Sequence, residues 1–439
     1  MEIRASIHSL SAYQSGPALA AGVKDSGVGS EPLGSSVDSC SLGEERNFIV
    51  SGLDAKGLQA FKSYVLANNE RNQVEELPLI GGCTLALDAQ DEVTLPKLEA
   101  AQEKGLLQLT PDGPRAMSIS GAHQVQAASD VPQMEPLKDH NQLLGVETLH
   151  AQGHTGAGTC ICILDTGIAP HPDLKDRIVA FKDFVNGAPL PYDDNGHGTH
   201  CAGIAAGDGR SSGGRYVGIA PEANIVGVKV LDRYNTGYDS NIIKGIQWAV
   251  DNKDRYGIDV LNLSLGHEIE ESRFFDPLTR AVQKAVRKGL SVVVSAGNSG
   301  PAPGTVQSPG NAPKAITVAA LNDNGTADRD DDFPASFSSC GPTKIDKLDK
   351  PDIAAPGVDI VSCAHDSANY VAMSGTSMAA PFTAGVVALL KEVQADLKPK
   401  EIKEAIMESA YQMPWQFQPH SLGAGVIDPP KAMEYIMRN

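Results

Sequence analysis

Beyond Gly145 the sequence alternates short, almost uninterrupted apolar runs with amphipathic helical stretches, and this alternation restricts the folds open to the chain. Strands without polar alternation are buried on both faces, as in parallel sheets whose crossover helices cover both sides. We therefore predict an α/β domain built on a doubly wound parallel sheet, with functional residues at the carboxyl ends of its strands. The expected strands cover residues 159–164, 224–231, 260–265, 291–296 and 315–320, and the expected helices include 241–254 and 277–288.

The residues before this α/β domain, which we assign to 143–439, divide into three parts. Residues 1–42 are rich in Ser, Gly and Ala without a sustained period, which predicts a disordered arm. Residues 43–118 predict a small α+β domain of the ferredoxin-like, split βαβ kind. Its expected elements are, in order, a strand at 47–50, a helix, a strand at 83–87, a second helix and a strand at 106–109. The first helix is capped by Asp54 and has Leu58, Phe61 and Val65 on its apolar face, and the second runs through Leu95 and Leu98. The stretch from Thr110 to Asp139 is rich in Pro, Gly, Ser, Gln and Asp, and we assign the linker that it predicts to residues 119–142.

Charge and cysteine content limit the classes of partner and compartment. With 36 Lys and Arg against 54 Asp and Glu, the net charge of −18 disfavours binding to nucleic acid or to an anionic membrane. The 439 residues contain no apolar run of membrane-spanning length and no apolar signal segment behind basic residues. The seven cysteines show no metal-binding spacing, and free thiols fit a reducing compartment. We expect a cytoplasmic protein, with non-classical export left open.

Three residues suited to nucleophilic hydrolysis stand where the expected local structure changes. Asp165 ends an apolar strand, His197 lies in a glycine-rich segment before a short helix at 202–206, and Ser377 directly precedes an apolar helix at 382–390. Nucleophilic hydrolysis needs a hydroxyl, an imidazole that takes its proton, and a carboxylate that holds the imidazole in one tautomer. Each residue alone fits a turn former, a loop histidine or a helix cap, but their joint occurrence favours a catalytic triad.

Two further features support the nucleophile. A serine at a helix start lies near unsatisfied N–H groups and the positive end of the helix dipole, with Pro381 tolerated in the first turn. Asn298, in a turn after a buried strand, could direct its amide at the same point and act as an oxyanion donor together with the N–H of Ser377.

These segments resemble the subtilase family of subtilisin-like serine peptidases. The matching segments are Leu164-Asp165-Thr166-Gly167, His197-Gly198-Thr199-His200, Gly375-Thr376-Ser377-Met378-Ala379-Ala380-Pro381 and Ala296-Gly297-Asn298. Their order along the chain is that of subtilisin. The resemblance covers about Gly145 to Asp428, and the segment from Asp193 to Gly218 resembles the AprX-like branch of the family.

The resemblance implies a serine endopeptidase that works through an acyl-enzyme and binds its protein or peptide substrate as an added strand. It implies a cleft bordered by Asn235, Thr236 and Gly237 on one side and by Ser264, Leu265 and Gly266 on the other. Uncharged walls at Leu265, Gly266 and Ala296 to Asn298 predict broad specificity with an apolar bias at P1. Residues 43–118 then correspond to an inhibitory prodomain, itself a partner of the catalytic domain, that the enzyme removes by its own cleavage.

No cofactor is expected for the chemistry, and the metal content is left open. The long calcium-binding loop of secreted subtilisins is missing after the His197 segment, and the acidic run from Asp328 to Asp332 lacks EF-hand spacing, so we interpret that run as a solvated loop. His200 lacks the partners of a zinc site and is expected to be a structural donor. Cys201 is expected to be a buried neighbour of His197 rather than a nucleophile.

Two other functions fit parts of the pattern. The first is an inactive binding protein on the same fold, which the intact set of catalytic residues disfavours. The second is a non-peptidase acyl hydrolase, which is disfavoured because Ser377 does not lie in a G-x-S-x-G elbow. The oligomeric state is not predicted.

Overall fold

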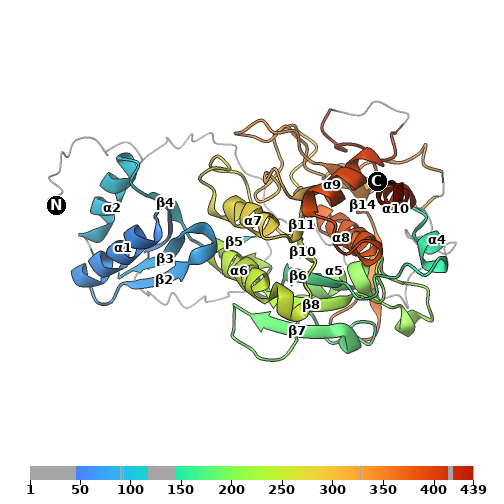
Figure 1. Cartoon of the computed structure of the whole chain (residues 1–439), viewed down its shortest axis with the longest axis horizontal. Coiled ribbons are helices and arrows are strands. Elements are labelled where there is room, and N and C mark those ends of the chain that lie inside the picture. The colour runs from blue at the N-terminus through green and yellow to red at the C-terminus, as the bar shows by residue number, and fades with distance from the viewer. Residues whose placement is uncertain are drawn as a thin grey trace, which may run out of the picture.

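The computed structural model describes residues 46–88, 91, 93–116, 144–326, 328–413 and 419–438. Figure 1 shows a small N-terminal domain beside a larger domain that holds the main sheet and most of the helices. The arm expected at 1–42 and the linker expected at 119–142 lie outside the described residues.

The small domain is a four-stranded antiparallel sheet in the order β2-β3-β1-β4. Its elements are β1 (Arg46–Ser51), α1 (Ala55–Asn68), β2 (Gln73–Leu77), the 3-10 turn η1 (Pro78–Ile80), β3 (Gly82–Leu87), α2 (Thr94–Glu103) and β4 (Gln108–Pro111). The carboxylate of Asp54 accepts a 2.6 Å hydrogen bond from the N–H of Gly57, so the expected helix cap is confirmed. The sequence did not predict β2, because only Leu77 of this edge strand is buried, and it placed β4 two residues too early.

The large domain contains an eight-stranded sheet in the order β13-β12-β11-β10-β6-β8-β7, with β14 also paired to β12. Every pair in it is parallel except β12 with β13. The strands are β6 (Cys160–Asp165), β7 (Ile178–Asp183), β8 (Asn224–Lys229), β10 (Val260–Leu263), β11 (Ser291–Ser295), β12 (Ile316–Asn322), β13 (Phe333–Pro334) and β14 (Ile353–Pro356).

Alternate residues of the central strand β6 enter two separate apolar cores, which explains why the strand is apolar throughout. Ile161 and Ile163 join the core beneath α5 (His197–Ala206) and α8 (Thr376–Val393). Cys160, Cys162 and Leu164 join the core beneath α6 (Asp239–Tyr256) and α7 (Pro277–Arg287). The predicted parallel sheet with helices on both faces is therefore confirmed.

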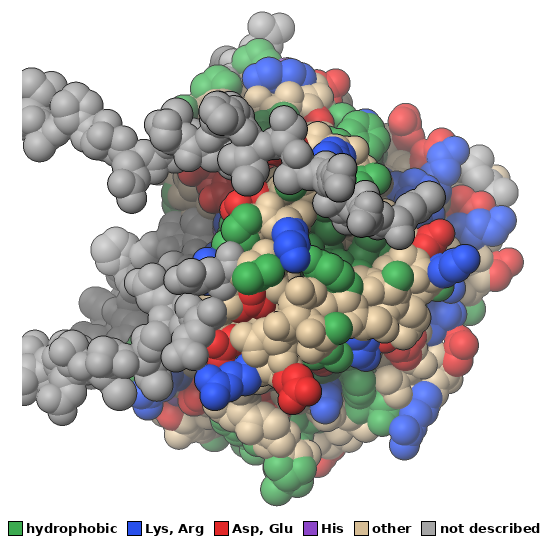
Figure 2. Space-filling view, turned by 90° about the vertical axis from the view of Figure 1, so that its left-hand side faces the viewer, with side chains coloured by type: hydrophobic (Ala, Val, Ile, Leu, Met, Phe, Trp, Pro, Cys, Tyr) green, Lys and Arg blue, Asp and Glu red, His purple; other side chains and the backbone are tan. Residues whose placement is uncertain are grey.

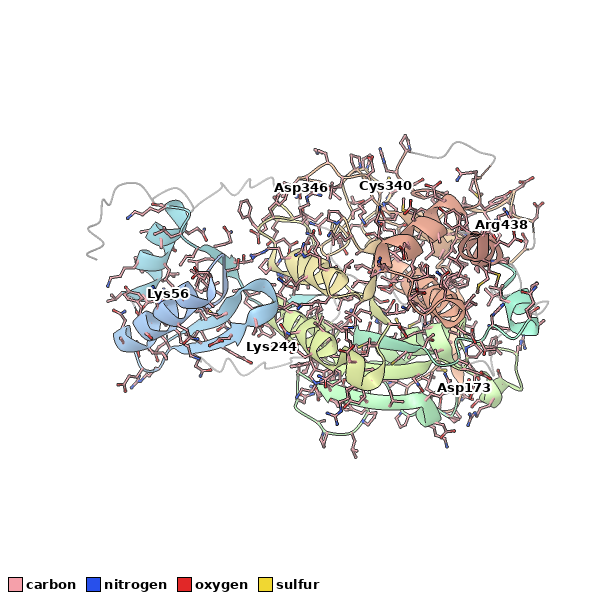
Figure 3. All side chains as sticks on the ribbon, in the orientation of Figure 1. Lys56, Asp173, Lys244, Cys340, Asp346 and Arg438 are labelled. Carbon is pink, nitrogen blue, oxygen red and sulfur yellow. The ribbon has the colours of Figure 1, made fainter. Side chains whose placement is uncertain are left out.

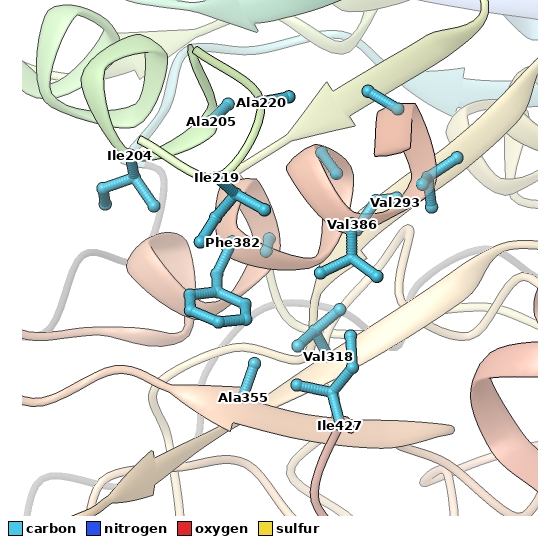
Figure 4. Close-up of a cluster of buried hydrophobic side chains, with 14 of the residues drawn as sticks. Ile204, Ala205, Ile219, Ala220, Val293, Val318, Ala355, Phe382, Val386 and Ile427 are labelled. Carbon is cyan, nitrogen blue, oxygen red and sulfur yellow. The ribbon is translucent and has the colours of Figure 1, made fainter. Parts of the chain in front are cut away.

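Both helices that carry catalytic candidates begin earlier than the sequence predicted. His197 is the first residue of α5 rather than part of a loop, and Ser377 is the second residue of α8 rather than its predecessor. Pro381 consequently lies in the second turn of α8 and not in the first. The packing of α8 explains its early start, since every residue from Thr376 to Leu390 is buried. Figure 4 shows Phe382 and Val386 of α8 among Ile204, Ile219, Val318 and Ile427, all members of this core.

The remaining elements surround these two cores. They are α4 (Val146–Ala151), the 3-10 turns η2 (Lys175–Arg177) and η3 (Arg210–Ser212), the antiparallel pair β15 (Ile360–Cys363) and β16 (Tyr370–Met373), α9 (Pro399–Glu408) and α10 (Pro429–Arg438). Over the described part of the chain, no helix combines the length and apolar character needed to cross a bilayer.

The small domain packs against α6 and α7 of the large domain. Ile49, Leu77, Leu79 and Ile80 belong to the same apolar core as the buried residues of these helices. Figure 3 places Lys244 of α6 at this junction, where its ammonium group pairs with the carboxylate of Glu75. Acidic and basic side chains are interspersed on the outer face at this end of the molecule (Figure 2).

Candidate active site

The carboxyl ends of three neighbouring strands bring the candidate residues together. Asp165 ends β6, Ser264 follows β10, and the segment Ala296 to Asn298 follows β11. Because β11, β10 and β6 are adjacent and parallel, these segments meet at one edge of the sheet. The sheet topology therefore brings these segments together at the carboxyl ends of the strands, where the sequence predicted the site.

Asp165 and His197 form a buried pair. Oδ1 of Asp165 lies 2.7 Å from Nδ1 of His197, and the same oxygen accepts the N–H of Thr166 at 2.7 Å. Burial opposes the imidazolium form, but the charge and hydrogen bonds of Asp165 and Cys201 together outweigh burial and raise the pKa of His197 well above its usual value. Nε2 of His197 has no hydrogen-bond partner among the described residues, so this nitrogen remains available as a base.

Asp193, which the sequence analysis did not identify, holds the segment that carries His197. Its Oδ1 accepts the N–H of Gly196 at 2.9 Å and the hydroxyl of Thr166 at 2.9 Å, and its Oδ2 accepts the N–H of Thr199 at 2.9 Å. The carboxylate therefore fixes the start of α5 to the residue that follows Asp165. The signal in the sequence is an aspartate that shortly precedes a helix, where carboxylates cap free N–H groups.

Gly198 allows α5 to approach the end of β6. A Cβ atom at this position would lie 2.1 Å from the carbonyl oxygen of Gly167 and 3.0 Å from Cβ of Asp165. Any larger residue would push the helix away from the strand and lengthen the contact between His197 and Asp165.

The hydroxyl of Ser377 donates to the carbonyl oxygen of Ser264 at 3.2 Å. The residue is 1% exposed and occupies the first turn of α8, where backbone N–H groups have no helical acceptor. Ser264, expected only to border the substrate, thus also contacts the candidate nucleophile.

Two N–H donors converge beside Ser377. Oδ1 of Asn298 accepts both the N–H and the hydroxyl of Thr376, each at 2.9 Å, which fixes the orientation of the amide. An ideal Cβ placed on Gly375 would lie 3.6 Å from Nδ2 of Asn298 and 3.6 Å from the backbone nitrogen of Ser377. Both nitrogen atoms therefore lie beside the same point, which allows them to act together on an oxyanion bound next to Ser377. The sequence analysis did not assign this supporting role to Thr376.

The predicted substrate edge is occupied by the chain's own N-terminal segment. Strand β5 (Arg115–Ala116) pairs antiparallel with β9 (Thr236–Gly237), so that Arg115 faces Gly237 and Ala116 faces Thr236. Asn235 precedes β9 with φ of 60° and is 7% exposed. On the other side, Leu265 and Gly266 are buried directly after Ser264.

Gly297 must be a glycine in this arrangement. Its φ is +105°, and a Cβ there would lie 2.6 Å from the side chain of Gln307. The neighbouring Ala296 is buried, so the wall formed by residues 296–297 is uncharged, as expected.

Cys201 and His200 flank the pair in α5. Sγ of Cys201 lies 3.4 Å from the carbonyl oxygen of Ser377 and 4.0 Å from Nδ1 of His197, and burial raises the pKa of this thiol. Nε2 of His200 lies 3.0 Å from the carbonyl oxygens of Ile360 and Val371, and burial lowers its pKa to about 3. His200 is therefore a neutral donor to β15 and β16, the structural role that the sequence predicted.

The described residues contain two groups of three potential metal ligands. One is Asp165, His197 and Cys201 of the candidate site, and the other is His171, Asp173 and Cys363. In the second group, Asp173 accepts the hydroxyl of Tyr370 at 2.5 Å and the N–H of Ser211 at 2.9 Å. Nδ1 of His171 accepts the N–H of Asp173 at 3.2 Å. These groups already satisfy one another and tie β16 to the preceding loops.

Comparisons with known proteins agree with the fold. The model of the subtilase family matches residues 156–425, more than half of the chain. Serine protease AprX of Bacillus subtilis (strain 168) is 46% identical over 304 residues, which are 64% of this chain and 67% of AprX. Thermostable alkaline protease of Halalkalibacterium halodurans is 37% identical over 267 residues, which are 61% of this chain and 66% of that protein. The alkaline protease of Alkalihalobacillus alcalophilus is 32% identical over 393 residues, covering 87% of this chain and 94% of that protein.

Two solved structures share the architecture. Fervidolysin from Fervidobacterium pennivorans aligns over 89% of this chain and 61% of its own with a TM-score of 0.68 at 24% identity, a likeness of fold. A cold-adapted subtilisin-like serine proteinase aligns over 62% of this chain and 88% of its own with a TM-score of 0.50 at 32% identity. The chain thus spans about two thirds of the length of the first two curated relatives and of fervidolysin. The family match, the sequence identities and the order of the matching segments together establish that the chain belongs to the subtilase family.

Proposed function

We propose that this chain is a serine endopeptidase that cleaves peptide bonds in proteins through Ser377, His197 and Asp165. The observation that carries the proposal is the strand pairing of Arg115–Ala116 on β9, because β9 is bridged to Leu231, whose N–H donates to the carbonyl of Asp165. Backbone pairing supplies affinity for almost any extended peptide, and side-chain pockets supply selectivity.

The geometry supports the following chemistry. The hydroxyl of Ser377 turns from the Ser264 carbonyl to Nε2 of His197, which takes its proton as the oxygen attacks the scissile carbonyl carbon. Asp165 fixes the tautomer of His197 and stabilises the imidazolium. Nδ2 of Asn298 and the N–H of Ser377 receive the charge that develops on the carbonyl oxygen. His197 then gives its proton to the leaving amine, an acyl-enzyme forms, and water hydrolyses it by the reverse sequence of proton transfers.

The small N-terminal domain would be an inhibitor and folding aid that the enzyme removes by its own cleavage. Four contacts support this role besides the β5–β9 pairing: Arg280 donates to the hydroxyl of Ser51 at 2.6 Å and to the carbonyl of Ile80 at 2.9 Å, and Glu271 accepts from Thr110 and Gln108, each at 3.1 Å. A tethered segment that fills the cleft inhibits at high effective concentration and stabilises the native fold. We expect the cut C-terminal to Ala116, within the range from Pro114 to Asp139.

Specificity, cofactor need and location follow as part of this proposal. Uncharged walls at Leu265, Gly266, Ala296 and Gly297 favour apolar P1 side chains. The reaction needs no metal or organic cofactor, since the four catalytic side chains supply nucleophile, base and oxyanion donors. A reducing, cytoplasmic location is supported by the six described cysteines, all of which are free and buried.

The test is labelling with a fluorophosphonate followed by digestion of casein. The proposal expects covalent labelling of Ser377 and cleavage of casein, both lost in Ser377→Ala. An unlabelled, folded protein would indicate an inactive binding protein, and labelling without proteolysis would indicate an acyl hydrolase of another kind.

A further inference from the structure

The side chain of Arg115 enters an acidic pocket beside the substrate edge. Nε of Arg115 lies 3.5 Å from Oδ2 of Asp239, and Nη1 lies 3.1 Å from Oε2 of Glu270 and 3.4 Å from Nδ1 of His267. We define the Arg115 pocket by these three residues, Asp239, His267 and Glu270. Asp239 begins α6 two residues after Gly237, and the other two follow Gly266, so the pocket lies between the two predicted borders of the cleft.

We propose that the Arg115 pocket is a substrate subsite that selects an arginine side chain on the N-terminal side of the scissile bond. The inference rests on the proposed endopeptidase function and specifies a substrate class for it. Arg115 enters the pocket from a strand already paired with β9, which is the path that a substrate strand would take. A substrate with arginine at the same place in the register would put the same group in the same pocket.

Burial gives this contact more weight than a surface ion pair. The side chain of Asp239 is 3% exposed and that of Arg115 is 18% exposed, whereas that of Glu270 is 65% exposed. Exposed pairs contribute little, but a partly desolvated carboxylate that has lost its water depends on a cation. Oδ1 of Asp239 is buried and has no hydrogen-bond partner among the described residues, so its charge relies on Arg115 and on His267, whose Nε2 lies 3.3 Å from Oδ2.

The local charge favours a cation when Arg115 is absent. Asp239, Glu270 and Asp276 all act on the guanidinium and together outweigh its burial, so the pKa of Arg115 rises above its usual value. Glu271 lies close enough for Asp276 and Glu270 to repel it, and its pKa is raised, chiefly by burial. When the N-terminal segment leaves, Asp239 and Glu270 lose Arg115, whereas Glu271 and Asp276 keep their interaction with Arg280. A basic side chain from a substrate would replace Arg115.

The shape of the contact favours arginine over lysine. The two carboxylates lie at two different nitrogen atoms of one planar group, with Asp239 at Nε and Glu270 at Nη1. A lysine ammonium is a single point charge and cannot reach both positions at once. Arginine should therefore be preferred over lysine, and both over alanine or glutamate.

The test compares quenched fluorescent peptides with the sequence of residues 112–123, carrying Arg, Lys, Ala or Glu at the position of Arg115. We expect the enzyme purified after expression of the full chain to cleave the Arg peptide about tenfold faster in kcat/KM than the Ala peptide, a difference of about 1.4 kcal/mol. Ratios between peptides are compared, so any residual inhibition by the small domain cancels.

Substitutions in the Arg115 pocket test whether the preference for arginine depends on that pocket. Glu270→Gln should reduce the advantage of Arg over Ala, and Asp239→Asn should reduce it further. Glu268→Gln is the matched control, because Glu268 is in the same loop but pairs with Lys344 outside the pocket. Glu270→Arg should improve cleavage of the Glu peptide relative to the Arg peptide, a gain that misfolding cannot produce.

The possible outcomes distinguish failure of the proposed subsite from failure of the proposed endopeptidase function. Equal cleavage of all four peptides, dependent on Ser377, would overturn the subsite and leave the endopeptidase standing. Failure to cleave any peptide or casein would overturn the proposed function and the subsite with it. A preference for arginine that persists unchanged in Glu270→Gln and in folded Asp239→Asn would also refute the pocket assigned here.

Discussion

Pro381 stands four residues after Ser377 in α8 and cannot donate the helical hydrogen bond that the Ser377 carbonyl would otherwise accept. That carbonyl oxygen accepts the hydroxyl of Ser264 at 2.8 Å and the thiol of Cys201 at 3.4 Å instead. Because Pro381 has no N–H, the Ser377 carbonyl contacts a residue just after β10 and a residue of α5 instead of the next turn of its own helix. These contacts fix the turn that carries the candidate nucleophile.

Ser264→Ala should slow catalysis without unfolding the protein. The Ser377 carbonyl would keep only the weak thiol donor, and one hydrogen bond contributes about 1 kcal/mol. We therefore expect kcat to fall about fivefold to tenfold with a smaller change in KM. Steady-state kinetics would check this, with Ser272→Ala as a control that removes a hydroxyl bonded to Asp346 instead. An unchanged kcat would show that the Ser264 hydroxyl does not position Ser377.

Cys201 should make the enzyme sensitive to mercury and cadmium ions although it is not the nucleophile. Its sulfur and ligand atoms of Asp165 and His197 lie within 4.8 Å of one another, so a thiophilic ion bound there would occupy His197. Burial raises the pKa of the thiol, so inhibition should develop slowly. Cys201→Ser should retain activity and lose the sensitivity, measured as residual proteolysis after timed exposure. A dead Cys201→Ser enzyme with native circular dichroism would contradict the assignment of Ser377.

The pH profile should report the raised pKa of His197. Neutral imidazole is the base, so kcat/KM should fall as the pH drops through a pKa above the usual 6.5 and reach a plateau above it. Asp165→Asn removes the charge that stabilises the imidazolium, so the apparent pKa should fall. The rate should drop about 10⁴-fold, the order of magnitude known for loss of the triad aspartate in subtilisin, a member of this family. An unshifted profile in Asp165→Asn would argue against coupling between the two side chains.

Gly375→Ala should disable the oxyanion donors selectively. The added methyl would touch Nδ2 of Asn298 and the nitrogen of Ser377 at ordinary contact distance, so the chain should fold but exclude the oxyanion. Loss of one such donor in subtilisin costs about 10²–10³ in turnover, and we expect at least that loss here. The thermal midpoint should stay close to that of wild type. Near-normal turnover would show that the two donors do not act at this point.

The sequence predicted the parallel sheet and the position of the site because both depend on local signals. The strand is apolar from Cys160 to Leu164 and buried on both faces, and its short length with cysteine and isoleucine favours a buried strand. Likewise, Asp54 and Gly57 form a helix cap within four residues of one another. Such features require no knowledge of distant contacts.

The parts that the sequence did not predict depend on contacts between distant segments. The start of α5 contains Gly198 and Thr199, which are poor helix formers, and burial against the end of β6 overrides their propensity. The role of Thr376 appears only when α8 meets the turn at Asn298, and the pocket around Arg115 forms only when β5 meets β9. Strand β2 was missed because its exposed residues carry no apolar alternation.

The central claim is that Ser377 cleaves the N-terminal segment of the same chain, which occupies the substrate cleft. The most direct measurement is the intact mass and N-terminal sequence of wild type and Ser377→Ala, expressed and purified side by side. We predict that wild type begins between Pro114 and Asp139, downstream of Ala116, and that folded Ser377→Ala keeps its N-terminal domain uncut. A wild-type enzyme that remains full-length and fully active, or identical processing of both proteins, would contradict the account.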